Sequence, residues 1–219
     1  MLQDGQKGAI LLRQSGKYAL TPRLLPGLIE SDTMKKIAVA ANAFDADGLV
    51  TNPDGTISVI GVKEEQVDQF WEYLGLPPSV TPVKPVVHCI ACCLGLKHCK
   101  QAMQDSFSLA QRLDKKYYGE RLPAELKIYV SGCVYDCRAS LTADIGFSGT
   151  FRGCQVVAGG VTGTVYRTAT VITENTDLRS ALNIVDNIID LYKNNAKNRQ
   201  KLGPFIDSIG IEKFIKSVA

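Results

Sequence analysis

Residues 126–137 of the chain read LKIYVSGCVYDC. The segment from Leu126 to Val130 is apolar, β-branched and aromatic, which predicts a buried strand. The Ser-Gly pair that follows ends this strand, so Cys133 and Cys137 are expected in the loop beyond it. Loops at strand ends are common places for ligands. We therefore expect a mixed fold of helices and strands with a ligand site at the end of this strand.

Two spaced pairs of cysteines, Cys93-x5-Cys99 and Cys133-x3-Cys137, are the strongest chemical signal in the sequence. Four thiolates are what an iron-sulfur cluster needs, so a 4Fe-4S cluster is the first interpretation. Structural zinc sites usually show ligand spacings of about two to four residues, which makes zinc a second interpretation. Reduced, buried cysteines are the third.

Three further cysteines, Cys89, Cys92 and Cys154, exceed a four-ligand site. All seven cysteines fall between Cys89 and Cys154, whereas a disulfide framework would spread them along the chain. Cysteine is among the most often buried residue types, so packed thiols are expected at these three positions. The two histidines, His88 and His98, receive no catalytic role.

The overall composition is that of an ordinary globular protein, with 219 residues, 45% hydrophobic and 21% charged. A net charge of +3 fits an anionic cofactor or substrate but falls short of a nucleic-acid-binding composition. No stretch approaches the roughly 18 uninterrupted apolar residues of a membrane span. We therefore expect no nucleic acid or membrane partner, and the cysteine usage favours the reducing cytoplasm.

Residues 1–76 are expected to form a small unit of strands and helices. An Asp-Gly pair at 54–55 predicts a tight hairpin turn, because it supplies the positive φ angles that such turns need. The expected elements are a strand at Lys7–Arg13, a helix at Arg23–Ala41, a hairpin of Gly48–Thr51 with Thr56–Val62, and a helix at Lys63–Leu74. This β-α-β-β-α order suggests a ferredoxin-like half-domain.

A proline-rich segment follows at residues 77–86 and is interpreted as a linker, because proline fixes φ and removes a backbone donor. The second domain is expected at residues 87–219. A helix predicted at Lys100–Tyr118 would place Cys99 beside its N-terminus.

The last third of the chain predicts two strands and two helices. Gly159-Gly160 separate the strands, and a cofactor could approach the backbone there. The strands are expected at Gln155–Ala158 and Thr164–Ile172, and the helices at Asp177–Asn194 and Pro204–Val218.

Three segments together resemble the cluster region of the sirohaem-dependent sulfite and nitrite reductases. They are Cys93-Leu-Gly-Leu-Lys-His-Cys99-Lys-Gln-Ala, Leu122 to Cys137, and Ala143-Asp-Ile-Gly-Phe147. The likeness extends to the C-terminal helices, and residues 8–74 look like the ferredoxin-like half-domain that precedes this region in the family. The resemblance implies a sandwich-like α+β fold. Within the family, the chain resembles the small single-half sulfite reductases.

The resemblance implies a 4Fe-4S cluster held by Cys93, Cys99, Cys133 and Cys137. It also implies that the Cys137 thiolate reaches the iron of a sirohaem, where sulfite or nitrite is reduced. An electron donor similar to ferredoxin would supply the electrons.

The resemblance also implies basic side chains around this centre. Arg13 and Lys127 are the candidates for substrate binding and proton supply. Lys127, Arg152 and Arg167, with Cys137, are the candidates for holding the sirohaem. The ordinary interpretation of each arginine and lysine is a solvated surface charge.

Several positions depart from the family's pattern. Val134 replaces a usual proline, Glu125 stands where a lysine is common, and Asn52 follows Thr51 where an arginine is expected. Asp136 adds a negative charge that would oppose cluster reduction if it pointed inward. These changes favour a rival interpretation, a non-enzymatic iron-sulfur electron carrier or accessory subunit.

The chain contains this half once, whereas the larger reductases contain it twice. A homodimer or a partner subunit is therefore expected to complete the haem pocket.

Overall fold

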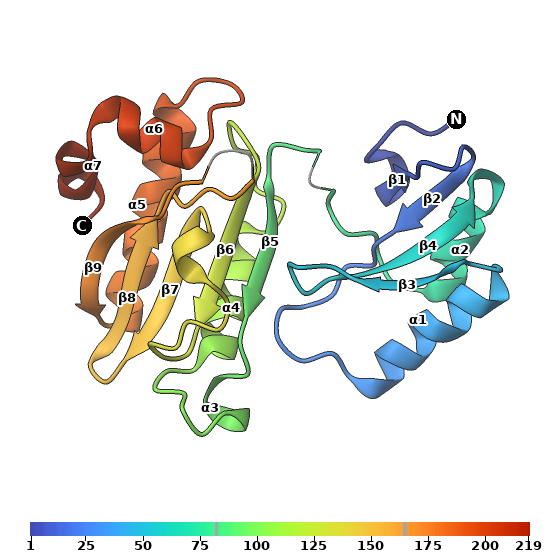
Figure 1. Ribbon diagram of the computed structural model, residues 1–219, viewed down its shortest axis with the longest axis horizontal. Coiled ribbons are helices and arrows are strands. Elements are labelled where there is room, and N and C mark those ends of the chain that lie inside the picture. Colours follow the sequence, from blue (N-terminus) through green and yellow to red (C-terminus); the bar gives the residue numbers. More distant parts are fainter. Residues whose placement is uncertain (82, 164–165) are drawn as a thin grey trace. The chain divides into compact units, whose positions relative to one another are not determined.

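The computed structural model describes residues 1–81, 83–163 and 166–219. The chain divides into two compact units, Met1–Lys84 and Pro85–Ala219. The first unit has an antiparallel sheet and the second has a mixed sheet (Figure 1). Each unit has its own hydrophobic core. The division falls within residues 77–86, the segment that the sequence assigns to a linker.

The first unit is a four-stranded antiparallel sheet with two helices. Its strands lie in the order β1-β2-β4-β3. Along the chain the elements are β1 (Ala9–Leu11), β2 (Lys17–Leu20), α1 (Ser31–Ala43), β3 (Gly48–Thr51), β4 (Ile57–Lys63) and α2 (Val67–Leu74), with short 3-10 turns at Gln6–Gly8 and Glu64–Gln66. The buried core joins Tyr18, Ile37, Val59 and Phe70, one from each of β2, α1, β4 and α2.

The hairpin and the second helix of this unit confirm their sequence signals. Gly55 has a φ of 87° in the turn between β3 and β4, and the Thr56 N–H donates to the Asp54 carboxylate at 2.9 Å. Helix α2 ends at Gly75, which is left-handed with φ 66°. Glycine adopts this conformation without a Cβ penalty, so the helix stops there.

Two expectations for the first unit are wrong. The sequence predicts no strand at Lys17–Leu20, but β2 lies there and pairs with both β1 and β4. Helix α1 starts at Ser31 instead of Arg23, because Gly27 has a φ of 104° and breaks the segment before it. The observed order is therefore β-β-α-β-β-α.

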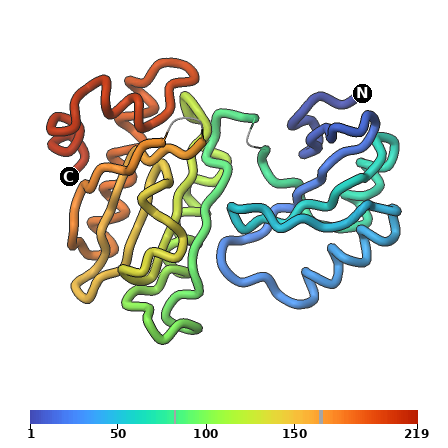
Figure 2. The backbone as a smooth tube through the Cα atoms, in the orientation of Figure 1, coloured from blue at the N-terminus to red at the C-terminus, as the bar shows by residue number. Residues whose placement is uncertain are grey.

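The second unit is a five-stranded sheet in the sequential order β5-β6-β7-β8-β9. Strands β5, β6 and β7 are parallel, and β7, β8 and β9 are antiparallel, as the arrows in Figure 1 indicate. Figure 2 traces the backbone of this unit from green through yellow to red. The strands are β5 (Val87–Cys92), β6 (Leu126–Ser131), β7 (Ile145–Thr150), β8 (Gly153–Ala158) and β9 (Thr170–Thr176). The helices are α3 (Gly95–His98), α4 (Ser106–Tyr117), α5 (Leu178–Asn195), α6 (Leu202–Ile209) and α7 (Ile211–Val218), with a 3-10 turn at Ser140–Thr142.

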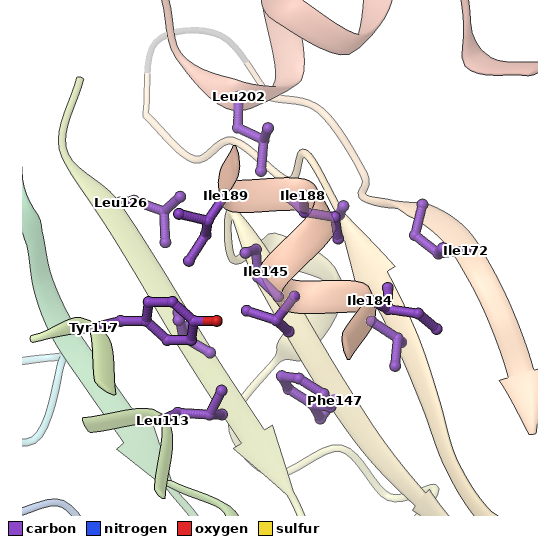
Figure 3. Packing of buried hydrophobic residues seen from close by; sticks show 14 of the residues in the cluster. Leu113, Tyr117, Leu126, Ile145, Phe147, Ile172, Ile184, Ile188, Ile189 and Leu202 are labelled. Carbon is purple, nitrogen blue, oxygen red and sulfur yellow. The ribbon is translucent and has the colours of Figure 1, made fainter. Parts of the chain in front are cut away.

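Helices α4 and α5 bury their apolar faces against one side of this sheet. Leu113 and Tyr117 of α4 and Ile184 and Ile188 of α5 lie in one cluster with Phe147 of β7 (Figure 3). Each fully buried side chain of this size stabilises the fold by roughly 1.5–3 kcal/mol. The packing fixes the sheet as a rigid base for the loops at its ends.

The second unit also differs from the sequence at several elements. Strands β5 and β7 are present where no strand is predicted. The last predicted helix is two helices, α6 and α7, because Gly210 with φ 89° breaks it.

The strand predicted at Thr164–Ile172 is β9, which starts at Thr170. Thr164 and Val165 lie outside the described residues. Arg167 forms an isolated antiparallel bridge with Val161 through two backbone hydrogen bonds of 2.9 and 3.0 Å, outside the strand.

Candidate iron-sulfur site

The candidate cysteines lie on two loops at one edge of the second sheet. Cys93 directly follows β5, and Cys133 follows β6 after one residue. Because β5 and β6 are parallel, their carboxyl ends meet at the same edge. Cys133 is buried, Cys93 and Cys99 are half-buried, and Cys137 is exposed. The fold thus brings the two sequence pairs to neighbouring loops.

Gly132 joins the two loops. Its N–H donates to the Cys93 Sγ at 3.1 Å, and its carbonyl accepts from the N–H groups of Met103 and Gln104 at 2.7 and 2.9 Å. A Cβ on Gly132 would lie 2.9 Å from the Gln104 carbonyl oxygen. Glycine is therefore needed here because the backbones of the two loops approach each other closely.

The surroundings of Cys93 suit a cluster ligand. Besides the Gly132 N–H, the Ser106 hydroxyl lies 3.5 Å from its sulfur. Hydrogen bonds of this kind stabilise a ligating thiolate and tune the cluster that it holds. In the described part of the chain, no three His, Cys, Asp or Glu side chains converge on one ion position. A cubane does not need such convergence, because each of its thiolates binds a different corner iron.

The helix after the first cysteine pair begins later than the sequence predicts. Helix α4 starts at Ser106, where the Asp105 carboxylate accepts from the Ser108 N–H as an N-cap. Cys99 instead follows the short helix α3, and its N–H bonds the Gly95 carbonyl at 2.9 Å. The expected placement of Cys99 at the N-terminus of a long helix is therefore wrong.

Asp136 organises the loop that carries Cys133 and Cys137. Its carboxylate accepts from the Ser131 hydroxyl at 2.8 Å and from the Ser140 N–H at 2.9 Å. The same Ser131 oxygen accepts from the Arg138 N–H at 3.1 Å. The carboxylate of Asp136 is thus hydrogen-bonded within its own loop, an arrangement that no local sequence pattern predicts.

Lys127 occupies the face of β6 opposite to the helices. Its side chain is half-buried, and its N–H donates to the Asp144 carboxylate at 2.9 Å. Tyr129 shares this face, and the guanidinium of Arg138 lies over the Tyr129 ring, 5.3 Å from its centroid. Arg138 adds a cation next to Cys137 that the sequence reasoning missed, although its position beside a candidate ligand was a signal for it.

Glu125 is paired with a lysine from a distant part of the chain. The Lys201 ammonium lies 2.9 Å from its carboxylate. Burial opposes ionisation of Glu125, but the hydrogen bond and charge of Lys201 outweigh it and lower the pKa of the carboxyl. The hydrogen bond to Glu125 likewise raises the pKa of Lys201. Glu125 stands where the family commonly has a lysine, and its negative charge is therefore neutralised by Lys201.

The candidate arginines occupy different settings. Arg167 is held within the protein, with hydrogen bonds from its guanidinium to the Asp207 carboxylate, the Gly159 and Thr168 carbonyls and the Thr170 hydroxyl. These bonds use all five of its N–H groups. A role for Arg167 toward a cofactor stays a prediction that requires it to release one of them.

Arg152 and Arg13 are exposed. Arg152 lies in the turn between β7 and β8 of the second unit, and Arg13 follows β1 of the first unit. Their predicted roles toward cofactor and substrate stay predictions.

The glycine pair after β8 is approached by the protein itself. A Cβ on Gly159 would lie 2.7 Å from the Ile206 side chain of α6, and a Cβ on Gly160 would lie 2.5 Å from the Ala143 carbonyl oxygen. The space beside the two glycines is therefore occupied by α6 and residues 141–143. The sequence had suggested that a cofactor could approach the backbone there.

The three surplus cysteines lie in packed positions. Cys89 and Cys154 are buried and Cys92 is half-buried. Burial raises the pKa of Cys92 to about 12 and that of Cys154 to about 11. Both therefore carry neutral thiols at physiological pH, as the interpretation of packed cysteines predicts.

Among the described helices, none is long and apolar enough to cross a membrane.

Residues 85–219 match the family described as the nitrite and sulphite reductase 4Fe-4S domain. The chain belongs to this family. The family's description supports an iron-sulfur cluster in the nitrite and sulphite reductase 4Fe-4S domain of this chain, as the four cysteines predict. It also supports the α+β fold class.

Curated relatives agree with this membership. The chain is 28% identical over 217 residues to the "Sulfite reductase, assimilatory-type" of Nitratidesulfovibrio vulgaris, covering 99% of both proteins. It is 26% identical over 200 residues to the "Nitrite reductase (NAD(P)H)" of Bacillus subtilis, covering 91% of this chain but 25% of that protein. The chain therefore spans the whole length of the first relative and about a quarter of the second.

Solved structures share the fold. The crystal structure of dissimilatory sulfite reductase I (DsrI) superimposes with a TM-score of 0.82 at 12% identity, covering 92% of this chain and 69% of that one. The Mycobacterium tuberculosis NirA protein gives a TM-score of 0.77 at 16% identity, covering 90% and 39%. Both likenesses show the α+β fold of this family.

Proposed function

We propose that this chain is an oxidoreductase that reduces sulfite to sulfide, with nitrite as the alternative anion. The observation that carries the proposal is the assimilatory-type sulfite reductase of equal length, whose match covers 99% of both chains. The nitrite reductases of Bacillus subtilis and Klebsiella oxytoca are roughly four times as long as this chain, since matches of 200 residues cover only 25% and 21% of them. The match over 99% of both chains therefore favours sulfite.

The residues of the two cysteine loops fit a 4Fe-4S cluster. Cys93, Cys99, Cys133 and Cys137 would hold it, and the exposed Cys137 is the thiolate that a sirohaem iron would share. Together the two groups would supply electrons to the bound anion. Lys127, Arg152 and Arg167 would neutralise the sirohaem carboxylates, and Arg13 and Lys127 would bind the anion and supply protons.

The test is anaerobic purification followed by iron and sulfide analysis, optical spectra and EPR. We expect about five irons per chain, four in the cluster and one in the sirohaem, with about four acid-labile sulfides, a cluster signal and a sirohaem band. Cys137→Ser should lose the coupling between the two signals, whereas the control Cys154→Ser should keep it, because Cys154 is a buried neutral thiol. A cluster signal without a sirohaem band would reject the enzyme assignment.

A second candidate function is a non-enzymatic iron-sulfur electron-transfer or accessory subunit. The chain is 24% identical over 195 residues to the "Assimilatory nitrate reductase electron transfer subunit" of Bacillus subtilis, covering 88% of this chain and 24% of that protein. Glu125 also supports it, because a carboxylate stands where the family commonly has a lysine, and that carboxylate occupies the Lys201 ammonium.

A charge change at Glu125 separates the two candidates. Glu125→Lys restores a lysine but also breaks the ion pair with Lys201, so Glu125→Gln is the matched control that breaks the pair without adding a charge. A reductase should bind sulfite more tightly in Glu125→Lys than in Glu125→Gln. Equal sulfite affinity of the two variants would favour the accessory subunit.

The domain limits and partners belong to the same proposal. We assign 1–76 to a ferredoxin-like half-domain, 77–86 to a linker and 87–219 to the cluster domain, in a cytoplasmic protein. A second copy or a partner subunit would complete the haem pocket. Sedimentation of the sirohaem-loaded protein as a monomer would contradict this association.

A further inference from the structure

A cavity of about 90 Å³ lies beside the two cysteine loops, between the start of α4, the ends of β6 and β7 and the starts of β8 and α5. Its lining includes three serines, Ser106, Ser108 and Ser131, beside apolar residues such as Leu109 and Phe147. A buried water needs two to four polar partners and about 30 Å³ of space. The cavity therefore has the volume and the polar groups to hold about three water molecules.

Ser106 connects this cavity to a candidate cluster ligand. It is only 2% exposed, and its hydroxyl donates to the Cys93 carbonyl at 3.2 Å and lies 3.5 Å from the Cys93 Sγ. A hydroxyl carries one proton, so it donates fully to one of these two acceptors at a time. Its oxygen also has two lone pairs, which can accept a hydrogen bond from water in the cavity. Ser106 can therefore turn its proton between the backbone and the sulfur.

Cys93 thus has one fixed donor and one donor that can turn. The fixed donor is the Gly132 N–H, which belongs to the backbone and lies 3.1 Å from the sulfur. The Ser106 oxygen is confined, because the Ser106 N–H donates to the Gln104 carbonyl at 3.1 Å and a Cβ on Gly95 would lie 2.8 Å from that oxygen. Since the oxygen is confined while its proton can rotate, the hydroxyl can respond to charge on the sulfur without movement of the loops.

We propose that the Ser106 hydroxyl, backed by water in this cavity, is a charge-responsive donor to the Cys93 sulfur and sets how readily the site accepts an electron. The inference rests on the cluster ligands of the proposed function and adds a residue that tunes them. When a reductant such as dithionite loses one electron to the site, the negative charge on the ligand sulfurs grows. This growth favours donation by Ser106 to the sulfur over donation to the carbonyl. The proton stays on Ser106, and no covalent bond forms or breaks.

Water in the cavity would strengthen this response. A water that donates to the Ser106 oxygen polarises the hydroxyl, and hydrogen bonds in a chain reinforce one another. Ser108 lines the same cavity but has a different partner, since its hydroxyl donates to the Asp105 carboxylate at 2.6 Å. Because both serines lie in the first turn of α4, Ser108 is the matched comparison for Ser106.

The test is an anaerobic redox titration of the full-length, cluster-loaded protein, followed by EPR. Ser106→Ala removes the hydroxyl and should make the reduction equilibrium about tenfold less favourable, which is a midpoint potential about 59 mV lower for one electron. Ser106→Thr keeps a hydroxyl and should restore most of the midpoint potential. Ser108→Ala should leave the midpoint potential unchanged, because that hydroxyl bonds Asp105.

Filling the cavity tests the part played by water. Cys154 lines the cavity from β8, so Cys154→Leu should exclude water while leaving both cysteine loops intact. The midpoint potential should fall, by less than in Ser106→Ala. In the Ser106→Ala background, Cys154→Leu should add no further shift, because the water acts through the hydroxyl. Iron per chain and urea unfolding check that each variant is folded, and Cys154→Leu alone keeps the test decisive if Ser106→Ala holds no iron.

Equal midpoint potentials of Ser106→Ala and Ser108→Ala would overturn the proposal, as would a wild-type midpoint potential in Cys154→Leu. An undiminished shift from Cys154→Leu in the Ser106→Ala background would also overturn it. No sulfite enters this titration, so its outcome is separate from turnover. A protein whose midpoint potential moves as expected but that reduces no sulfite would overturn the proposed function alone.

Discussion

Asp144 is a buried acid whose ionisation acts against folding. It is 7% exposed and begins the turn into β7, where its carboxylate accepts the Lys127 N–H. Burial raises its pKa to about 6 from the ordinary 3.8, and the Lys127 N–H only partly opposes this. Because the folded state favours the protonated form of Asp144, this carboxyl contributes stability that is fully present below about pH 4. The contribution is lost as the pH rises through about 6.

Asp144→Asn should therefore be more stable than the parent protein at pH 8 and equal to it near pH 4. Asparagine keeps an acceptor for the Lys127 N–H but carries no charge. At about 1.4 kcal/mol per pKa unit, the gain at pH 8 is at most roughly 3 kcal/mol. Urea unfolding at both pH values measures it, and an equal gain at pH 4 would show that the effect is not ionisation.

Asp136 shows the opposite use of a carboxylate, as a structural acceptor in the Cys133–Cys137 loop. Asp136→Ala would leave the Ser140 N–H without its acceptor, at a cost of about 1–3 kcal/mol. Asp136→Asn keeps an oxygen there and should lose less. Iron per chain and urea unfolding are the measurements. Wild-type iron content and stability in Asp136→Ala would contradict the structural role.

At the scale of elements, the loops after β5 and β6 depend on a close approach by β7. A Cβ on Gly149 of β7 would lie 2.3 Å from the Gly132 carbonyl oxygen, which accepts the N–H groups of Met103 and Gln104. The strand thus supports the hydrogen bonds that connect the two cysteine loops.

Gly149→Ala should displace the Gly132 carbonyl and loosen both loops. We expect a loss of about 1–3 kcal/mol in the free energy of unfolding, together with less iron per chain. Gly119→Ala is the matched control: its φ is +80° but its Cβ would meet no atom within 4 Å. It should lose only the roughly 1–2 kcal/mol of a left-handed backbone and keep its iron. Equal iron loss in both variants would reject the explanation.

Elements with strong local signals were predictable from the sequence, and elements without them were not. The β3–β4 hairpin has Asp-Gly at its turn, and α2 and α5 have apolar residues at helical spacing, so each was placed within a few residues. Strand β2 is only Lys17–Leu20, too short for a periodic pattern. Strand β5 contains two cysteines that were considered as ligands or thiols and not as strand residues.

At the scale of the whole molecule, the two units have separate cores. Every buried residue of one core belongs to Met1–Lys84, and every buried residue of the other belongs to Pro85–Ala219. Because the cores share no residue, a cavity in one should destabilise mainly that unit.

Phe70→Ala should lower the stability of the first unit by about 3–5 kcal/mol, and Phe147→Ala should do the same for the second. Both side chains are fully buried. Calorimetry should show two transitions, with each variant moving one of them. A single transition that both variants shift equally would mean that the units unfold together.

From the amino-acid sequence alone, the two cysteine pairs and their expected iron-sulfur chemistry could be predicted. The spacing of four cysteines, the strand that leads to Cys133 and the helical faces are local patterns, and local patterns are legible without a fold. How the cysteine loops are held in place depends on the tertiary structure. Gly132 reaches Cys93 across 39 residues, and Lys201 neutralises Glu125 from α6's N-terminal edge. Such contacts join distant segments, so only the packing of parallel strands and helices could bring them together.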